Sequence, residues 1–245
     1  MSVGGLTGLA DEFGGHCTAE ERTVRSRVDR PAVAVTSPAP LAPFRLETPR
    51  LVLRDFTDED ALALQPWGSD PEVIRYETWG PYDDEQVTEY VRRAAAARLE
   101  RPRTTFEVGL VLKGSTLLIG AGRIRVRRDD RAEHLEGDIG CALRRDAWGR
   151  GYATEAACAL LDFTLHLGVR RISATCQVEN VRSLRVLQKL GMRCEGRFRH
   201  EARERDALRD SYLYVLRERD IEHPIGPHGP ALCPSCSGWR VAAAH

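Results

Sequence analysis

Hydrophobic and polar positions follow regular spacing only between Phe44 and about residue 221. Alternating or short continuous apolar runs predict strands. Their approximate limits are 46–54, 106–112, 117–126, 135–143, 171–178, 193–201 and 211–216. Apolar residues at helical spacing predict helices at about 58–64, 85–99, 151–167 and 180–190. Because strands and helices are mixed along one domain, the pattern predicts an α+β (mixed α/β) fold.

The segments on either side of this span lack such spacing. Residues 1–43 are rich in Gly, Ala, Pro, Ser and Thr, a composition that predicts a disordered leader. Residues 223–245 return to proline and glycine, which predicts a flexible tail. The predicted organisation is therefore a leader (1–43), one domain (44–222) and a tail (223–245).

The tail contains residues of the types that bind zinc, namely His223, His228, Cys233 and Cys236. Structural zinc sites usually place their histidines closer together and within regular structure, so a flexible tail is favoured and no metal site is predicted. The alternative, a zinc-dependent interaction protein, predicts bound metal that is lost when the residues after Ile221 are removed.

Composition and charge narrow the class of protein. The 245 residues are 42% hydrophobic and 29% charged with zero net charge, so no global field favours a nucleic-acid partner. The 7 cysteines are scattered, mostly within apolar patterns, which is typical of reduced thiols. No apolar run approaches the roughly 18 residues of a membrane span, and no signal peptide is evident. We expect a cytoplasmic protein without a membrane partner.

A strand, a glycine turn and a helix follow one another between Asp138 and Gly168. Gly149 and Gly151 bracket the turn, where backbone with positive φ is easily adopted and no side chain blocks a ligand. The helix that follows has unpaired N–H groups and the positive end of its dipole at this turn. Arg144, Arg145 and Arg150 lie beside it in sequence. The segment therefore predicts a site for an anion such as a phosphate.

Two familiar phosphate motifs do not fit this turn. A dinucleotide fingerprint needs a third glycine where this chain has Thr154. A P-loop needs Gly-Lys-Ser/Thr, but the chain's lysines are Lys113 and Lys189. On the turn alone, a strand-to-helix connection without any ligand stays an open alternative.

Motifs along the whole domain occur in an order and spacing that belong together. They are Glu47-Thr-Pro-Arg-Leu-Val-Leu-Arg54, Ile139-Gly140, Trp148-Gly-Arg-Gly-Tyr-Ala-Thr-Glu-Ala156, and Asn180-Val-Arg-Ser183 through Lys189-Leu-Gly-Met192. The combination resembles the GCN5-related N-acetyltransferase (GNAT) superfamily, and within it the ribosomal-protein N-terminal acetyltransferase-like (RimJ/RimL-like) branch. The resemblance covers about 44–221. It implies a mostly antiparallel sheet of about seven strands, flanked by helices and splayed between the fourth and fifth strands.

The resemblance also implies a reaction, in which an acetyl group moves from acetyl-CoA to the primary amine of a protein N-terminus or a small molecule. The pantetheine arm would lie along the fourth strand and the pyrophosphate on the glycine turn. Carried over residue by residue, the implied coenzyme contacts are Ile139, Cys141, Leu143, Arg144, Gly149, Arg150, Gly151, Tyr152, Ala153, Thr154, Asn180 and Ser183. For Asn180, helix capping is an equally good reason for the residue, and the two roles are compatible.

The catalytic assignments also follow from the resemblance. Ser183 would donate a hydrogen bond to the departing thiolate or relay a proton, because Leu187 stands where many members have an acidic tyrosine. Asp138 and Glu136, two apart on one strand and so on one face, are candidates for the base that deprotonates the amine. A surface serine and an exposed acidic strand end are the structural alternatives. A second departure, Trp148, replaces the usual Gln or Arg but leaves backbone contacts available.

Other functions remain open at this level. The chain could be a non-catalytic acyl-CoA sensor, or transfer a longer acyl group such as succinyl, whose second carboxylate Arg125 or Arg197 would recognise. A covalent route through Cys141 is a minor alternative to direct attack in a ternary complex, because no histidine partner is identifiable. The loop from Tyr76 to Tyr82 and the last two strands are expected to wall the acceptor cleft. The protein is expected to be a monomer or a homodimer.

Overall fold

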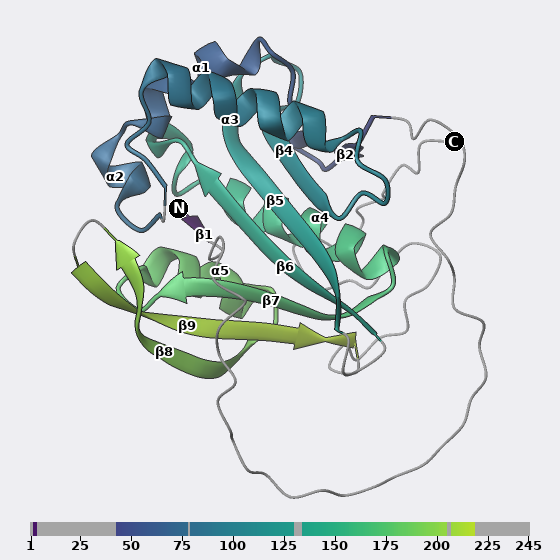
Figure 1. Cartoon of the computed structure of the whole chain (residues 1–245), viewed down its shortest axis with the longest axis vertical. Helices are drawn as coiled ribbons and strands as arrows, with labels where there is room; N and C mark the ends of the chain where they lie inside the picture. Colours follow the sequence, from purple (N-terminus) through teal and green to yellow (C-terminus); the bar gives the residue numbers. More distant parts are fainter. Residues whose placement is uncertain (1, 4–42, 78, 130–133, 205–206, 219–245) are drawn as a thin grey trace, which may run out of the picture.

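A computed structural model describes residues 2–3, 43–77, 79–129, 134–204 and 207–218 (Figure 1). Most residues of the predicted domain (44–222) are among them, and its bounds stay a prediction. The predicted tail and nearly all of the predicted leader lie outside them, as do both histidines and both cysteines of the possible zinc cluster.

The described strands form one sheet in the order β2-β3-β4-β5-β6-β7-β9-β8, and β1 pairs separately with β6. The strands are β1 (Ser2–Val3), β2 (Arg45–Glu47), β3 (Leu51–Asp55), β4 (Thr105–Leu112), β5 (Leu118–Asp129), β6 (His134–Leu143), β7 (Val169–Gln177), β8 (Arg193–Glu204) and β9 (Ala207–Arg217). Every pair is antiparallel except β6 with β7. The expected mixed, mostly antiparallel sheet is confirmed.

Helices cover both faces of the sheet. They are α1 (Asp60–Gly68), α2 (Pro71–Ile74), α3 (Asp84–Ala97), α4 (Tyr152–His166) and α5 (Val181–Lys189), with a 3-10 turn, η1, at Arg145–Ala147. In Figure 1, α1 and α3 lie in front of the sheet and α4 lies behind it. Strand alternation explains the two layers: Leu110 packs in the α4 core, while Val111 packs in the core beneath α1 and α3.

Two local features differ from the sequence prediction. The expected first strand at 46–54 is two strands, because Thr48 turns the chain: the Leu51 N–H donates to Thr48 Oγ1 (2.8 Å) and the Thr48 N–H to the Leu51 carbonyl (2.9 Å). α2 is an additional short helix, which Asp70 caps by accepting from the Glu72 N–H. Together with β1, the split raises the number of described strands from the expected seven to nine.

The parallel pair β6–β7 is short. Leu135–Asp138 pair with residues 169–173, but from Ile139 onward β6 has no pairing with β7. In that gap β1 pairs with β6, with Ser2 opposite Ala142 and Val3 opposite Cys141 (Figure 1). The predicted splay between the fourth and fifth expected strands, at 135–143 and 171–178, is thereby confirmed.

One buried carboxylate joins the glycine-turn helix to the turn between β2 and β3. Glu155, in the first turn of α4, is 4% exposed. Its oxygens accept from the Thr48 hydroxyl (2.6 Å), the Arg50 N–H (2.8 Å) and Arg50 Nε (2.6 Å). The contacts span more than one hundred residues of sequence, so they fix where α4 begins relative to the sheet.

Replacing Glu155 by alanine should lower the free energy of unfolding by about 2–4 kcal/mol, because a buried hydroxyl and Arg50 lose their acceptor. The matched control is Glu89→Ala on α3, where Glu89 makes only exposed ion pairs, with Arg92 and Arg93. The control should leave the free energy of unfolding almost unchanged, because water screens an exposed ion pair. Urea unfolding measures both variants, and equal losses would contradict this account.

Candidate active site

The glycine turn has the backbone expected of an anion site. Gly149 and Gly151 adopt φ of 76° and 80°, in the left-handed region that side chains disfavour. A Cβ on Gly149 would meet nothing within 4 Å, so the conformation, and not lack of space, requires glycine there. Gly151 caps α4 without any side-chain hydrogen bond. The first amides of this 15-residue helix are therefore not capped by a side chain, as in sites that bind phosphate.

Arginine side chains surround the turn from two directions. Arg150 is exposed on the turn itself, and Arg144 pairs with Asp146 at 2.7 Å. Arg50 approaches from the β2–β3 side: its Nη1 donates to the Arg150 carbonyl (2.9 Å), and its guanidinium lies 4.7 Å from the Tyr152 ring centre. Arg50 was not predicted as a site residue from the sequence. It lies within the Glu47–Arg54 motif, which indicated the family but no contact with the glycine turn.

Trp148 holds the end of β6 against the turn. Its indole N–H donates to the Leu143 carbonyl at 2.8 Å, and the Arg182 guanidinium lies 5.1 Å from its ring centre. A cavity of about 260 Å³ lies here between α2 and the start of α5, lined in part by Trp148, Asn180 and Arg182. Trp148 thus holds the turn against β6 through its side chain, and the backbone N–H groups of the turn stay available to a ligand.

Asn180 and Ser183 lie at the start of α5. The Asn180 Oδ1 accepts from the Ser183 N–H (3.2 Å), which is the predicted cap. The Ser183 Oγ is fully buried, and within the described part of the chain it has no hydrogen-bond partner of normal geometry. Beside it, burial raises the pKa of the Cys176 thiol to about 12, an effect that the Ser183 hydroxyl opposes. A buried hydroxyl that lacks a full hydrogen bond is costly, so a ligand acceptor that reached this side chain would stabilise it.

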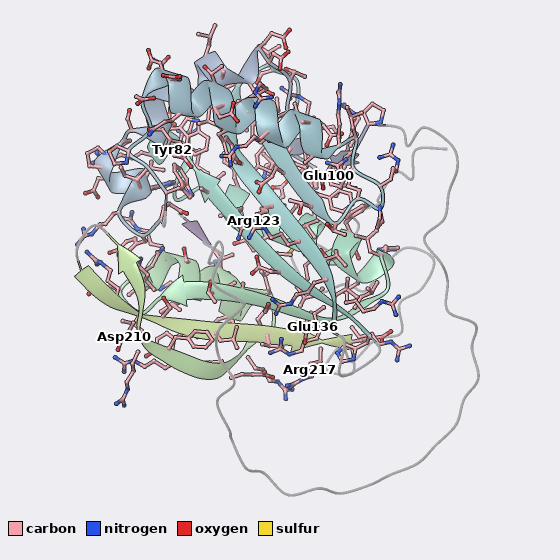
Figure 2. All side chains as sticks on the ribbon, in the orientation of Figure 1. Tyr82, Glu100, Arg123, Glu136, Asp210 and Arg217 are labelled. Carbon is pink, nitrogen blue, oxygen red and sulfur yellow. The ribbon has the colours of Figure 1, made fainter. Side chains whose placement is uncertain are left out.

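A cavity of about 460 Å³ opens between the α1–α3 layer and strands β4 to β6. Its wall is aromatic: Trp79 stacks on Tyr82 with ring centres 5.3 Å apart, and Trp67 and Tyr90 lie next to them. Figure 2 shows Tyr82 and Glu100 near the two ends of α3, with Arg123 below and between them. The aromatic loop was expected to line the acceptor cleft, and it does line this cavity. Residues of β8 and β9, expected there too, are not among the described residues that line it.

The floor of the cavity is charged. Glu107 of β4 and Arg123 of β5 are paired in register and point to the same face, and Asp138 of β6 shares that face. Arg123 Nη2 donates to Asp138 Oδ1 at 3.0 Å, and the Tyr90 hydroxyl donates to Glu107 Oε2 at 3.1 Å. Burial raises the pKa of both carboxyls, against the opposing effect of Arg123. Glu107 lines the cavity directly, whereas Asp138 acts on it through Arg123.

Glu136 shares a sheet face with Asp138, as predicted, but lies outside this cavity. It makes ion pairs with Arg127 (3.2 Å) and Arg171 (3.4 Å). In Figure 2 it lies near Arg217, away from Tyr82 and Arg123. The two carboxylates thus share a face, as predicted, but each is paired with arginine and neither is among the described residues that line the cavity. Glu107 was missed because a single glutamate in an alternating strand carries no sequence signal.

The odd-numbered residues of β6 face α4. Ile139, Cys141 and Leu143 are buried in the α4 core, so only their backbone can contact a ligand in the gap. The Cys141 Sγ lies 4.0 Å from the Ala153 carbonyl, and burial raises its pKa to about 12. A thiol with so high a pKa is not a nucleophile near neutral pH, which disfavours the covalent route.

Within the part of the chain that the structure describes, no cluster of three or more His, Cys, Asp or Glu is arranged to hold a metal ion. Among the same residues, no helix is long and apolar enough to cross a membrane.

Comparison with known proteins identifies the class. Residues 50–193 match the acetyltransferase (GNAT) domain family, and this chain belongs to that family. Among its relatives, the uncharacterised N-acetyltransferase YnaD of Bacillus subtilis (strain 168) is 32% identical over 178 residues, which cover 72% of this chain and 99% of the relative.

Solved structures agree with the family assignment. A GNAT-family acetyltransferase from Bacillus anthracis is 29% identical, with a TM-score of 0.61 over 72% of this chain and 99% of that one. Mycobacterium smegmatis RimJ, solved in complex with CoA-disulfide, has a TM-score of 0.62 at 24% identity, over 74% of this chain and 89% of that one. The predicted family, fold and N-acetyltransferase class are confirmed, and acetyl-CoA is the co-substrate of this class. The glycine turn and the side of β6 from which β7 parts after Asp138 fit such a coenzyme.

Replacing Glu107 by glutamine should stabilise the protein more at about pH 7.5 than at about pH 4. Because the pKa of Glu107 is raised in the folded state, the folded protein binds its proton more tightly than the unfolded chain. The stability that protonated Glu107 contributes is therefore fully present below the pKa that Glu107 has in the unfolded chain. It is lost as pH rises through the raised pKa of the folded state. Glutamine keeps an acceptor for Tyr90 and removes this loss.

Thermal unfolding of both proteins at the two pH values measures the difference. Glu89→Gln, at an exposed position of α3, controls for the loss of one negative charge. If the difference in stability between Glu107→Gln and the wild type is the same at both pH values, burial does not destabilise the Glu107 carboxylate.

Proposed function

We propose that this acetyltransferase joins acetyl-CoA and a primary amine in one ternary complex at the gap between β6 and β7. The observation that carries the proposal is the position of that gap. β6 leads to the glycine turn at one end, and its residues 140–142 border the 460 Å³ cavity. A donor along β6 and an acceptor in the cavity would therefore meet without either leaving its site.

On the donor side, we assign the pantetheine arm to the backbone of Ile139–Leu143 and the pyrophosphate to the amides of residues 149–154. Arg144, Arg150 and Arg50 supply positive charge beside those amides. β1 pairs with part of the same β6 backbone, at Cys141 and Ala142. Donor binding along that backbone therefore displaces β1, and the pairing itself is a precedent for an extended partner at this edge.

On the acceptor side, the cavity would hold the amine above Glu107. Glu107 takes the proton that the ammonium must lose, and its raised pKa makes it a better base near neutral pH. The amine nitrogen then attacks the thioester carbonyl; the C–N bond forms, the C–S bond breaks, and the second proton that the nitrogen loses passes to the departing thiolate. Backbone N–H groups of β6 stabilise the oxyanion, and the Ser183 hydroxyl donates to the departing thiolate.

Asp138 is one of the two candidate bases that the sequence offered. It lies beyond Arg123 from the cavity and is hydrogen-bonded to that arginine. Its role in our proposal is to hold Arg123 in place, while Glu136 is neutralised by Arg127 and Arg171. A non-catalytic sensor of acyl-CoA is the competing function, and it would bind the donor without releasing thiol.

Gly149→Ala should weaken the binding of coenzyme A by about tenfold or more, because a side chain at positive φ reorients the amides that bind the pyrophosphate. Gly114→Ala is the matched control. Gly114 has φ of 81° and, like Gly149, would place its Cβ within 4 Å of nothing, but it lies in the β4–β5 hairpin. Each variant should lose about 1 kcal/mol of stability. Titration calorimetry measures binding, and equal weakening in both variants would refute the assigned pyrophosphate site.

Purified protein should release free thiol from acetyl-CoA only when an amine is present. Ser183→Ala should lower kcat about 10- to 100-fold with little change in the KM for acetyl-CoA, because the hydroxyl acts on the departing thiolate. Glu107→Gln should lower kcat/KM by a similar factor and remove the acidic limb of its pH profile, and Asp138→Asn should retain that limb. Donor binding without thiol release from any amine would favour the sensor.

A further inference from the structure

Arg125 is a cavity residue that the proposed mechanism does not use. It is half-buried, lines the cavity, and within the described residues has neither a hydrogen bond nor an ion pair. The other two arginines of the cavity do have partners. Arg123 donates to Asp138 at 3.0 Å, and Arg93 lies 3.8 Å from Glu89. Arg125 therefore presents a free guanidinium to the cavity.

The surroundings of Arg125 increase its need for an anion. Burial and the neighbouring Arg123 both lower its pKa, and the nearby carboxylates Glu107 and Asp138 offset this only in part, from beyond ion-pair distance. A guanidinium has a planar fork of donors that matches a carboxylate, so a carboxylate from outside the protein would satisfy it. Arg197, the other residue considered for this chemistry, already pairs with Asp210 at 2.6 Å.

The position of Arg125 relates the anion to the reaction. Arg123 and Arg125 lie opposite Gly140 and Asp138 of β6, where β6 and β7 begin to part. Two residues of a strand span about 7 Å. A carboxylate on Arg125 would thus lie within one short molecule's length of the Gly140 backbone, which borders the same cavity. The cavity wall, formed by Trp79, Tyr82 and Tyr90, suits an apolar or aromatic group.

We infer that the acceptor is an amino acid, or a close analogue, whose amine reacts, whose carboxylate binds Arg125 and whose apolar side chain packs on the aromatic wall. This inference rests on the proposed function. The inference distinguishes an amino-acid acceptor from a peptide N-terminus, whose carboxylate lies many residues away from the amine. It also distinguishes that acceptor from simple amines, which would leave Arg125 without an anion.

The test compares L-phenylalanine with L-phenylalanine amide and phenethylamine as acceptors for acetyl-CoA, using full-length protein and thiol release. The kcat/KM for phenylalanine should exceed that for the amide by about tenfold or more. Arg125→Gln should remove this preference through KM, and Arg125→Lys should retain part of it. Arg128→Gln, at an exposed position of β5 outside the cavity, is the matched control and should keep the preference.

The outcomes distinguish this inference from the proposed function. Equal use of phenylalanine and its amide by the wild type would overturn the inference and leave the transferase intact. The inference would also be overturned if acetyl-CoA raised the thermal stability of the protein but no thiol were released with any of the three acceptors. Preference for succinyl-CoA with phenethylamine, lost in Arg125→Gln, would overturn it too, because the carboxylate would then belong to the donor. No thermal shift with any acyl-CoA would instead refute the proposed function itself.

Discussion

The early parting of β6 and β7 is the constraint on which the site depends. Parallel strands that separate leave backbone N–H and C=O groups without their ladder partners, and such groups must be satisfied elsewhere. Here β1 satisfies some of them, opposite Cys141 and Ala142. The same parting brings the glycine turn after β6, the start of α5 after β7 and the aromatic cavity to one place. In the proposed complex, an extended donor along β6 would use the groups that β7 leaves unpaired.

The charged floor of the cavity shows a cost that such a site carries. Glu107, Arg123 and Asp138 lie partly or largely out of water, and burial raises the pKa of both carboxyls although an arginine lies between them. A core built only for stability would place apolar residues here. Retaining ionisable groups whose pKa is shifted towards neutrality is typical of sites that transfer protons. The stability lost at this floor is offset by the two apolar cores on either side of the sheet.

Glu155 explains why two distant motifs occur together. In sequence, Thr48 and Arg50 belong to the first motif and Glu155 to the glycine-turn motif, and nothing local connects them. In the fold, three hydrogen bonds join them at a buried carboxylate. That junction holds the start of α4 and places Arg50 beside the glycine turn. A resemblance recognised from motifs thus reflects a physical contact that the motifs alone do not state.

Features that depend on neighbours along the chain could be predicted from the sequence alone. Glycine spacing predicted the turn at 149–151, Asn180 predicted the α5 cap, and apolar periodicity predicted most strands and helices, because each follows from local backbone and side-chain preferences. In contrast, the charged side chains that share a cavity could be identified only from the tertiary structure. Register across β4, β5 and β6 brought Glu107, Arg123 and Arg125 under α3 and left Glu136 outside, because cross-strand pairing and helix placement depend on contacts between distant segments.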